Sequence, residues 1–305
     1  MTGGGWVALG LTLVAAPALP GIVHRTRSLL TGRRGAPIVQ PYRDLARLWR
    51  KGTVYSRTTT WVFRVAPLLL LATTAAAASL LPLDGRSAAL TFTGDFVAFA
   101  GLLALGRFAL VLAALDTGSS FEGMGASREG TFGSLGEPAL VLCFAALALA
   151  TGGTSLVAMF SEAPSVWSAA GPALTMVAGG LLLLAIAETG SVPVDDPATH
   201  LELTMIHEVM VLDHSGPDLA LIQYATALKL ALFGTMVVNL LVPRAGLPVA
   251  ASLALWLLGL AAVAVVLGVV EATMARLALT RVPRFLAAAA ILPAFAIILL
   301  LGFAG

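Results

Sequence analysis

Hydrophobic and polar positions fall into long blocks along this chain. Eight apolar stretches recur with polar intervals between them, at residues 5–23, 61–81, 93–115, 137–158, 171–188, 218–241, 249–270 and 284–303. A helix needs about 20 mainly apolar residues to cross a bilayer, and it satisfies its own backbone hydrogen bonds there. The pattern therefore predicts eight transmembrane helices.

Composition narrows the class of protein further. Hydrophobic residues make up 58% of the chain and charged residues 11%, against about 25% charged in a typical soluble domain. We therefore expect an all-α integral membrane protein in which residues 1–305 form a single transmembrane domain. Its surroundings would be a lipid bilayer, with no nucleic acid among its partners.

The single cysteine, Cys143, lies inside an apolar stretch. One cysteine excludes both a disulfide framework and a cysteine-ligated cluster built from this chain alone. We therefore expect no cofactor in this chain, and any redox centre should belong to a partner.

Lysine and arginine are concentrated in alternate connections between the predicted helices. The first connection carries Arg25, Arg27, Arg33, Arg34, Arg43, Arg47, Arg50, Lys51 and Arg57. The third carries Arg128, the seventh Arg276 and Arg281, and the opposite side only Arg86 and Arg244. By the positive-inside rule, the odd-numbered connections face the cytoplasm and both termini face outward, in the cell (inner or plasma) membrane.

The first connection also contains an amphipathic segment, PYRDLARLWR at residues 41–50. Leu45, Leu48 and Trp49 fall on one helical face, opposite the arginines. This pattern predicts a helix lying along the membrane surface. A lipid anchor is one interpretation, and a wall of a functional cavity is the alternative.

The fifth connection is the most titratable part of the chain. Residues 187–216 hold six of the sixteen acids and three of the four histidines. Asp196 before Pro197 is a good helix start, and Ser215 before Gly216 a good stop, so we predict a helix between them.

The histidines in this connection do not form a metal site. His200, His207 and His214 are seven residues apart, and seven residues climb about 10.5 Å along a helix, too far for one ion. Val211 also stands where a zinc-peptidase helix starting at His207 would need its second histidine. We therefore predict no metal site.

Four charged residues lie within or at the edge of apolar stretches, where an ionisable group is costly and usually functional. They are Arg107, Glu137, Glu188 and Lys229. They form either a chain of titratable sites running inward from the fifth connection, or buried ion pairs that neutralise one another. The residues alone leave both readings open.

The fifth connection resembles the loop after the fifth helix of the complex I membrane subunit that meets the peripheral arm. The matching positions are Ala187, Glu188, Thr189, Pro193, Asp195, Glu202 and Leu203. The departures are Ser191, Val194, Ala198 and His200. With these departures, the loop resembles that of the corresponding subunit of group 4 membrane-bound nickel-iron hydrogenases, the formate hydrogenlyase subunit 4 or hydrogenase-4 component C type.

Three further segments carry the same resemblance, so it spans nearly the whole chain. They are RRGAPIVQPYRDLARL from Arg33, LDTGSSFEGMGASRE from Leu115 and EATMARLALTRVPR from Glu271. The resemblance implies a noncatalytic membrane-anchor and ion-coupling subunit. Its partners would be a hydrogenase large subunit with a nickel-iron centre, a small subunit with iron-sulfur clusters, and antiporter-like membrane subunits.

The resemblance also suggests which residues carry these roles. We expect an ion path, for protons or sodium, through Arg107, Glu137, Glu188, Asp195, Glu202, His207, Glu208, Asp213 and Lys229. We expect a docking surface or cavity wall formed by Arg33, Arg34, Gln40, Tyr42, Asp44, Trp49, Asp116, Arg128, Glu129, Asp196, His200 and Arg276.

Two alternative functions remain. The chain would be the quinone-cavity subunit of a complex I-like quinone oxidoreductase if the cavity of that family were kept. An independent channel or carrier is the other, but we identify in the sequence no broken pair of helices of the kind that marks such proteins.

Overall fold

The computed structural model describes residues 3–195, 205–244 and 246–303, and within these ranges the regular structure is helical with no strand. The long helices are α1 (Gly3–Ala15), α2 (Ala18–Leu30), α3 (Gln40–Trp49), α4 (Trp61–Leu80), α5 (Asp95–Asp116), α6 (Ser120–Thr151), α8 (Trp167–Glu188), α9 (Gly216–Leu241), α10 (Val249–Thr273) and α11 (Val282–Phe303). Short elements are α7 (Leu156–Glu162), η2 (Glu208–Val211) and η3 (Leu279–Arg281).

Seven helices are long and apolar enough to cross a membrane, and the bent pair α1–α2 makes an eighth span if it is counted as one. The expectation of an all-α membrane protein with about eight spans is therefore confirmed. Most predicted boundaries lie within a few residues of the observed ones.

Helix α6 departs most from its predicted boundary. It begins at Ser120, whereas the sequence predicted a span beginning at residue 137. Glu122 and Glu129 made this segment look like a solvated connection, yet both are buried, at 1% and 6% exposure. The helix extends because other parts of the fold cover these carboxylates.

The first span is broken. Helices α1 and α2 meet at an angle of 45° near Pro17, which has no N–H to continue the backbone ladder. The carbonyl oxygens of Leu13 and Val14 instead accept hydrogen bonds from the hydroxyls of Tyr224 (2.7 Å) and Tyr42 (2.6 Å). The sequence analysis did not predict this break, which among the described residues is a single broken span and not a pair of broken helices.

The helix predicted between Asp196 and Ser215 is wrong where it can be checked. Residues 196–204 lie outside the described ranges, and residues 205–214 form only the short η2 and turns. Backbone N–H groups here are taken by side chains, since Asp195 accepts from His207 (2.8 Å) and Glu122 accepts from Asp213 (3.0 Å). Such side-chain bonds compete with a helical ladder.

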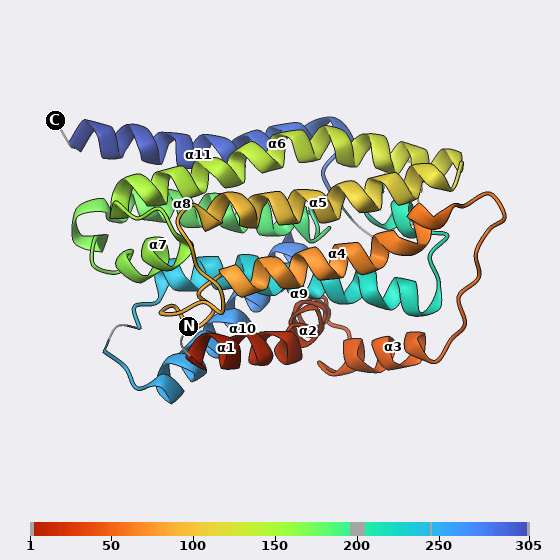
Figure 1. The fold of residues 1–305 in the computed structure, drawn as a ribbon, viewed down its shortest axis with the longest axis horizontal. Coiled ribbons are helices and arrows are strands. Elements are labelled where there is room, and N and C mark those ends of the chain that lie inside the picture. The colour runs from red at the N-terminus through yellow and green to blue at the C-terminus, as the bar shows by residue number, and fades with distance from the viewer. Residues whose placement is uncertain (1–2, 196–204, 245, 304–305) are drawn as a thin grey trace.

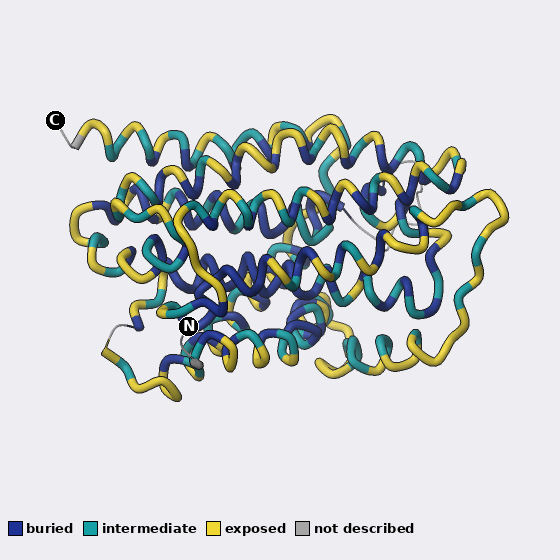
Figure 2. Tube along the Cα trace, viewed as in Figure 1, coloured by how far each residue is buried: buried dark blue, intermediate teal, exposed yellow. Residues whose placement is uncertain are grey.

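Helix α9 lies inside the bundle and packs against α4, α8, α10 and α3, while α6 and α11 lie farther away at the top of Figure 1 (Figures 1 and 2). In its most apolar window 78% of the residues are buried, against 28% for α10 and 22% for α11. Lipid is the expected environment of the exposed apolar side chains on the outer helices.

The connections after α3, α5 and α8 lie towards one end of the bundle, at the right of Figure 1. We call this the basic end, because it carries the arginine-rich segment 25–57. Both chain ends lie towards the left of the view. Which end faces the cytoplasm stays a prediction from the arginine distribution.

Close packing of α2 on α10 gives the first testable prediction. A Cβ added at Gly268 would lie 2.7 Å from both the Val23 carbonyl oxygen and Thr26 Cβ, whereas one at Gly10 would meet nothing within 4 Å. Gly268→Ala should therefore destabilise the protein by about 1–3 kcal/mol. Thermal unfolding in detergent measures this, with Gly10→Ala as the control expected to be neutral. Equal midpoints for the two variants would contradict the packing.

Candidate functional site

The charged residues predicted at membrane depth meet at one guanidinium group. Arg107 of α5 contacts Glu129 (3.1 Å) and Glu137 (2.8 Å) from α6, and it donates a short hydrogen bond to Glu188 at the end of α8. Its side chain is only 9% exposed. A guanidinium presents five donors in a rigid planar fork, so one arginine can contact three carboxylates that approach from different directions.

Two further contacts extend this group towards α9 and the fifth connection. Lys229 Nζ of α9 lies 3.6 Å from Glu188, and His207 Nε2 lies 3.4 Å from Glu129. His207 Nδ1 lies in turn 3.5 Å from Asp195. We call the seven connected side chains the charge cluster, namely Arg107, Glu129, Glu137, Glu188, Asp195, His207 and Lys229.

The charge cluster holds more carboxylates than bases. It has four acidic groups against Arg107, Lys229 and His207, so within it a negative charge is left over even when His207 is protonated. Mutual attraction among its buried members offsets part of the hydration that they lose, and removal of one partner would leave an uncompensated buried charge. The predicted ion pairs are present, and the contacts are continuous from Asp195 to Glu137. That this chain of contacts acts as an ion path stays a prediction.

His207 and Asp195 lie where the fifth connection meets the charge cluster, and their surroundings shift the pKa values of both. Burial disfavours the protonated form of His207, but the carboxylates of Glu129 and Asp195 outweigh it and raise its pKa above 6.5. Burial likewise opposes ionisation of Asp195, but the hydrogen bond and charge of His207 and two backbone N–H groups lower its pKa below 3.8. The structure thus favours a protonated histidine beside an ionised aspartate.

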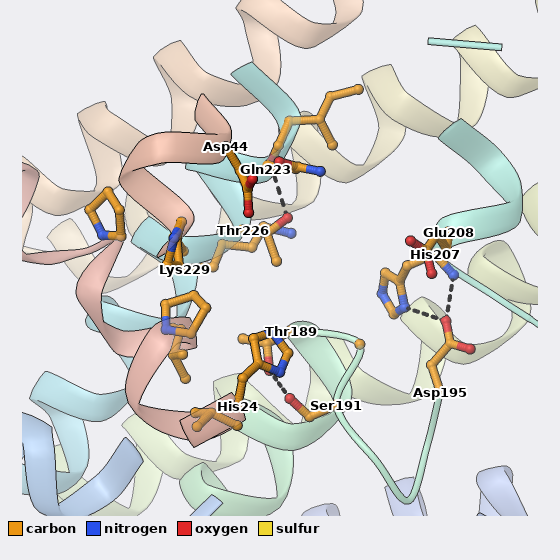
Figure 3. Close-up of a pocket in the computed structure, with 18 of the residues that line it drawn as sticks. His24, Asp44, Thr189, Ser191, Asp195, His207, Glu208, Gln223, Thr226 and Lys229 are labelled. Atoms are coloured by element: carbon orange, nitrogen blue, oxygen red, sulfur yellow. Dashed lines mark hydrogen bonds and ion pairs between the residues drawn. The ribbon is translucent and has the colours of Figure 1, made fainter. Parts of the chain in front are cut away.

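A cavity of about 560 Å³ opens beside the charge cluster. One part of its wall comes from the bend at Pro17, from α2 and from α3, and the other from α9 and the fifth connection. Both parts mix apolar residues with charged ones, such as Arg27 and Asp44 in the first and Asp195 and Lys229 in the second. Figure 3 shows side chains of both parts around it, including His24, Asp44, Asp195, His207, Gln223 and Lys229. This volume and mixed lining suit a small amphipathic molecule.

No group of three or more histidine, cysteine, aspartate or glutamate side chains among the described residues is arranged to hold a metal ion. The chemistry that the described side chains offer is proton exchange and hydrogen bonding.

Other residues predicted for the ion path lie apart from the charge cluster. Glu208 lines the cavity, and Asp213 is exposed with its N–H bonded to Glu122. Glu202 falls outside the described residues.

The residues predicted for docking or for the cavity wall spread over the basic end. Gln40 and Asp44 line the cavity, and Gln40 donates a hydrogen bond to Asp44 (3.0 Å). The Tyr42 hydroxyl on α3 donates a hydrogen bond to the Val14 carbonyl on α1. Trp49, at 57% exposure, Arg33 and Arg34 are free to meet lipid or a partner. Asp196 and His200 fall outside the described residues.

The remaining residues predicted for docking have structural contacts of their own. Asp116 accepts from the Thr60 N–H (2.7 Å) at the start of α4. Arg128 donates to the Met205 carbonyl (2.7 Å), holding the fifth connection against α6. Arg276 is half-buried in the connection after α10.

Sequence reasoning missed several residues of the cavity. His24, Arg27 and Glu271 line it, and Arg27 lies 3.7 Å from Glu271. Glu129 was expected at the docking surface but belongs to the charge cluster. Glu271 offered a signal, since it is an acid at the end of an apolar stretch, like Glu188.

The family model described as NADH dehydrogenase matches residues 5–302. This chain belongs to the NADH dehydrogenase family. The resemblance carried by its connections to a complex I membrane subunit is thereby confirmed.

Two curated members from Escherichia coli (strain K12) are similar to it. Hydrogenase-4 component C is 34% identical over 236 residues, which cover 76% of this chain and 73% of that protein. Formate hydrogenlyase subunit 4 is 31% identical over 280 residues, covering 88% and 89%. The chain is therefore a membrane subunit of a complex I-like, multisubunit assembly.

A solved structure shares the fold. A chain of the membrane-bound sulfane sulfur reductase, an archaeal respiratory membrane complex, superposes with a TM-score of 0.81 at 21% identity, covering 97% of this chain and 99% of that one. At this identity the likeness concerns the fold of the family alone.

Removing the central cation tests the energetics of the charge cluster. Arg107→Ala leaves three carboxylates without their shared partner, so we expect a loss of about 3–5 kcal/mol or no folded protein. Adding Glu188→Gln should recover part of this loss, because it removes one of the stranded charges. Thermal unfolding and folded yield in detergent measure both. A double variant no more stable than the single one would contradict the arrangement.

The raised pKa of His207 predicts how stability depends on pH. A histidine whose pKa is higher in the folded state stabilises fully below its unfolded pKa, about 6.5, and loses that contribution as the pH rises through the folded value. The unfolding midpoint should therefore fall on the alkaline side, and His207→Gln should flatten this slope. On the alkaline side His214 is the control, since burial lowers its pKa to about 4 and above pH 7 it is neutral in the folded and the unfolded states alike. A slope unaltered in His207→Gln would contradict the prediction.

Proposed function

We propose that this chain is the noncatalytic membrane-anchor and ion-coupling subunit of an energy-converting hydrogenase complex of the formate hydrogenlyase kind. It docks an arm of a nickel-iron large subunit and an iron-sulfur small subunit at its basic end. It couples electron transfer in that arm to proton or sodium movement in antiporter-like membrane subunits. The names of the two curated relatives support this assignment.

One observation carries the proposal: the charge cluster is continuous from a surface connection to membrane depth. It starts at Asp195 and His207 beside the fifth connection and reaches Glu137 in the middle of α6. Groups in contact titrate together, so a change of charge at one end alters proton affinity at the other. A subunit that only anchored an arm would not need buried charges at this depth.

The basic end supplies the surface for the arm. Exposed arginines of the first connection, together with the fifth connection, present charge on the face where the cluster begins. The nickel-iron and iron-sulfur centres would supply the redox chemistry when the arm is bound. This chain's residues hold and move protons at carboxylate and imidazole groups.

Co-purification tests the docking role. Solubilising the complex from its native membrane in mild detergent should retain a nickel-iron large subunit and an iron-sulfur small subunit with this chain. A complex that contains neither would contradict the proposal.

Glu188→Gln tests the coupling role. The amide keeps the shape of the side chain but cannot ionise, so the redox reaction of the arm should continue while ion movement falls by at least about tenfold. Gas production and the ion gradient in inverted membrane vesicles measure the two quantities. Glu162→Gln, an exposed position on α7, is the control expected to leave both unchanged. Undiminished ion movement in Glu188→Gln would contradict the role of the cluster.

The cavity favours a second candidate function, a quinone-binding subunit of a complex I-like oxidoreductase. Its volume of about 560 Å³ and its mixed lining of apolar and charged side chains on α2, α3 and α9 suit a molecule with a polar head and an apolar tail. Quinone reduction that a head-group inhibitor abolishes would support it. The neighbouring genes distinguish the two functions, since a large subunit that keeps its four nickel-binding cysteines indicates a hydrogenase.

A further inference from the structure

Two arginines at the start of α11 carry charge that no described residue neutralises. Arg281 is the last residue of η3, and Arg284 follows it in the first turn of α11. Both are exposed, and neither side chain forms an ion pair or a hydrogen bond within the part of the chain that the structure describes. The helix dipole opposes cations in the first turn of a helix, so α11 itself gives no reason for them.

The length of α11 after Arg284 matches the apolar core of a bilayer. The 19 residues 285–303 carry no charged side chain. They rise about 29 Å along a helix, against a hydrocarbon thickness of about 30 Å. The two guanidinium groups therefore lie at the level of the lipid headgroups, which long basic side chains at helix ends reach readily.

An exposed apolar stripe continues from Arg284 along the outer side of α11. Helix α11 packs against α6 and α8, and Ala289 and Ala296 are fully buried. Ile291, Phe295 and Ile298 lie away from this packed side and are 51%, 54% and 62% exposed. Figure 2 shows α11 at the edge of the bundle with exposed residues recurring along it. Since Ile291 follows Arg284 by seven residues, or about two turns, the stripe and the arginines share one side of the helix.

The start of α11 is also attached to the neighbourhood of the charge cluster. The Leu277 N–H, just before η3, donates to the Pro193 carbonyl of the fifth connection (2.9 Å). Leu286 of α11 borders a small space together with Glu129 and His207. A molecule held by the two arginines would therefore fix the first turn of α11 beside the fifth connection.

Charge decides between the possible occupants of this surface. An apolar stripe alone would suit either a lipid or a helix of another subunit. A phospholipid with a net negative headgroup offers phosphate oxygens to both guanidinium groups and an acyl chain to the stripe in one molecule. A zwitterionic phospholipid carries its own cation beside the phosphate, so it gains less from the arginines.

We propose that an anionic phospholipid of the phosphatidylglycerol class binds along α11. Its phosphate lies between Arg281 and Arg284, and one acyl chain follows Ile291, Phe295 and Ile298. The bound lipid stabilises the start of α11 and, through Leu277, the fifth connection. This inference is independent of the proposed function, because it requires neither an arm nor ion movement.

Native mass spectrometry of the purified full chain tests the headgroup contact. After delipidation in detergent and addition of equal amounts of phosphatidylglycerol and phosphatidylcholine, the chain should retain several-fold more phosphatidylglycerol. Arg281→Gln combined with Arg284→Gln should lower this adduct by roughly tenfold, because each arginine at an anionic headgroup strengthens binding. Equal retention of the two lipids by the unaltered chain would overturn the proposal.

A matched variant controls for the loss of charge. Lys51→Gln combined with Arg57→Gln removes the same two charges from exposed positions in the connection after α3. It should retain phosphatidylglycerol as the unaltered chain does. An equal loss of adduct in both double variants would mean that net charge alone attracts the lipid, and would overturn the site.

The unfolding midpoint distinguishes a lipid from a free anion. Phosphatidylglycerol should raise the midpoint of the unaltered chain by several degrees and that of the Arg281→Gln, Arg284→Gln variant by much less. Inorganic phosphate in place of the lipid should leave both midpoints unchanged. A rise with phosphate equal to the rise with phosphatidylglycerol would assign the arginines to a free anion and refute the lipid.

Photo-crosslinking in the intact complex tests the stripe. A benzophenone amino acid at Phe295, which keeps an aromatic side chain there, should form an adduct with the mass of an anionic phospholipid. An adduct with a transmembrane segment of another subunit would show that a protein covers the stripe and would overturn the proposal.

Discussion

The contact of Arg107 with three carboxylates is the interaction on which the interior of this protein depends. It joins α5 to α6 and α8, and Lys229 adds the central helix α9 through Glu188. Each carboxylate would be costly alone at membrane depth, and so would the guanidinium. The helices must therefore pack so that these groups meet, and this requirement sets which faces of the four helices point inward.

The charge cluster borders three other parts of the structure. It meets the fifth connection through His207 and Asp195, the large cavity through Glu188 and Lys229, and a groove between α5 and α6 through Glu137. Because the groups are in contact, the protonation of one depends on that of the others. Under the proposed function, this arrangement lets an event beside the arm alter the charge of Glu137 at the other end of the cluster.

The broken first span places irregular backbone beside the cavity, because Pro17 at the bend is one of the residues that line it. Pro17 ends the α1 ladder, and the hydroxyls of Tyr42 and Tyr224 replace the lost backbone donors. Irregular backbone at membrane depth is tolerated where protein groups or a cavity satisfy it. The bend turns α2 towards α10 and leaves space between α2, α3 and α9, which the cavity occupies.

The sequence by itself determined the class of the protein, its spans and its family, because apolar length, arginine distribution and connection motifs are local properties of the chain. It also singled out Arg107, Glu137, Glu188 and Lys229, because charges in apolar stretches are conspicuous. Only the tertiary structure decided how these charges pair and that Glu129 joins them. Long-range contacts likewise extended α6 to Ser120 and replaced the helix predicted after Asp196 with η2 in its described part. The pairing of the charges and the bounds of these helices depend on which residues, distant in the sequence, form hydrogen bonds or ion pairs with a buried carboxylate or N–H group. A local sequence pattern contains no information about such contacts.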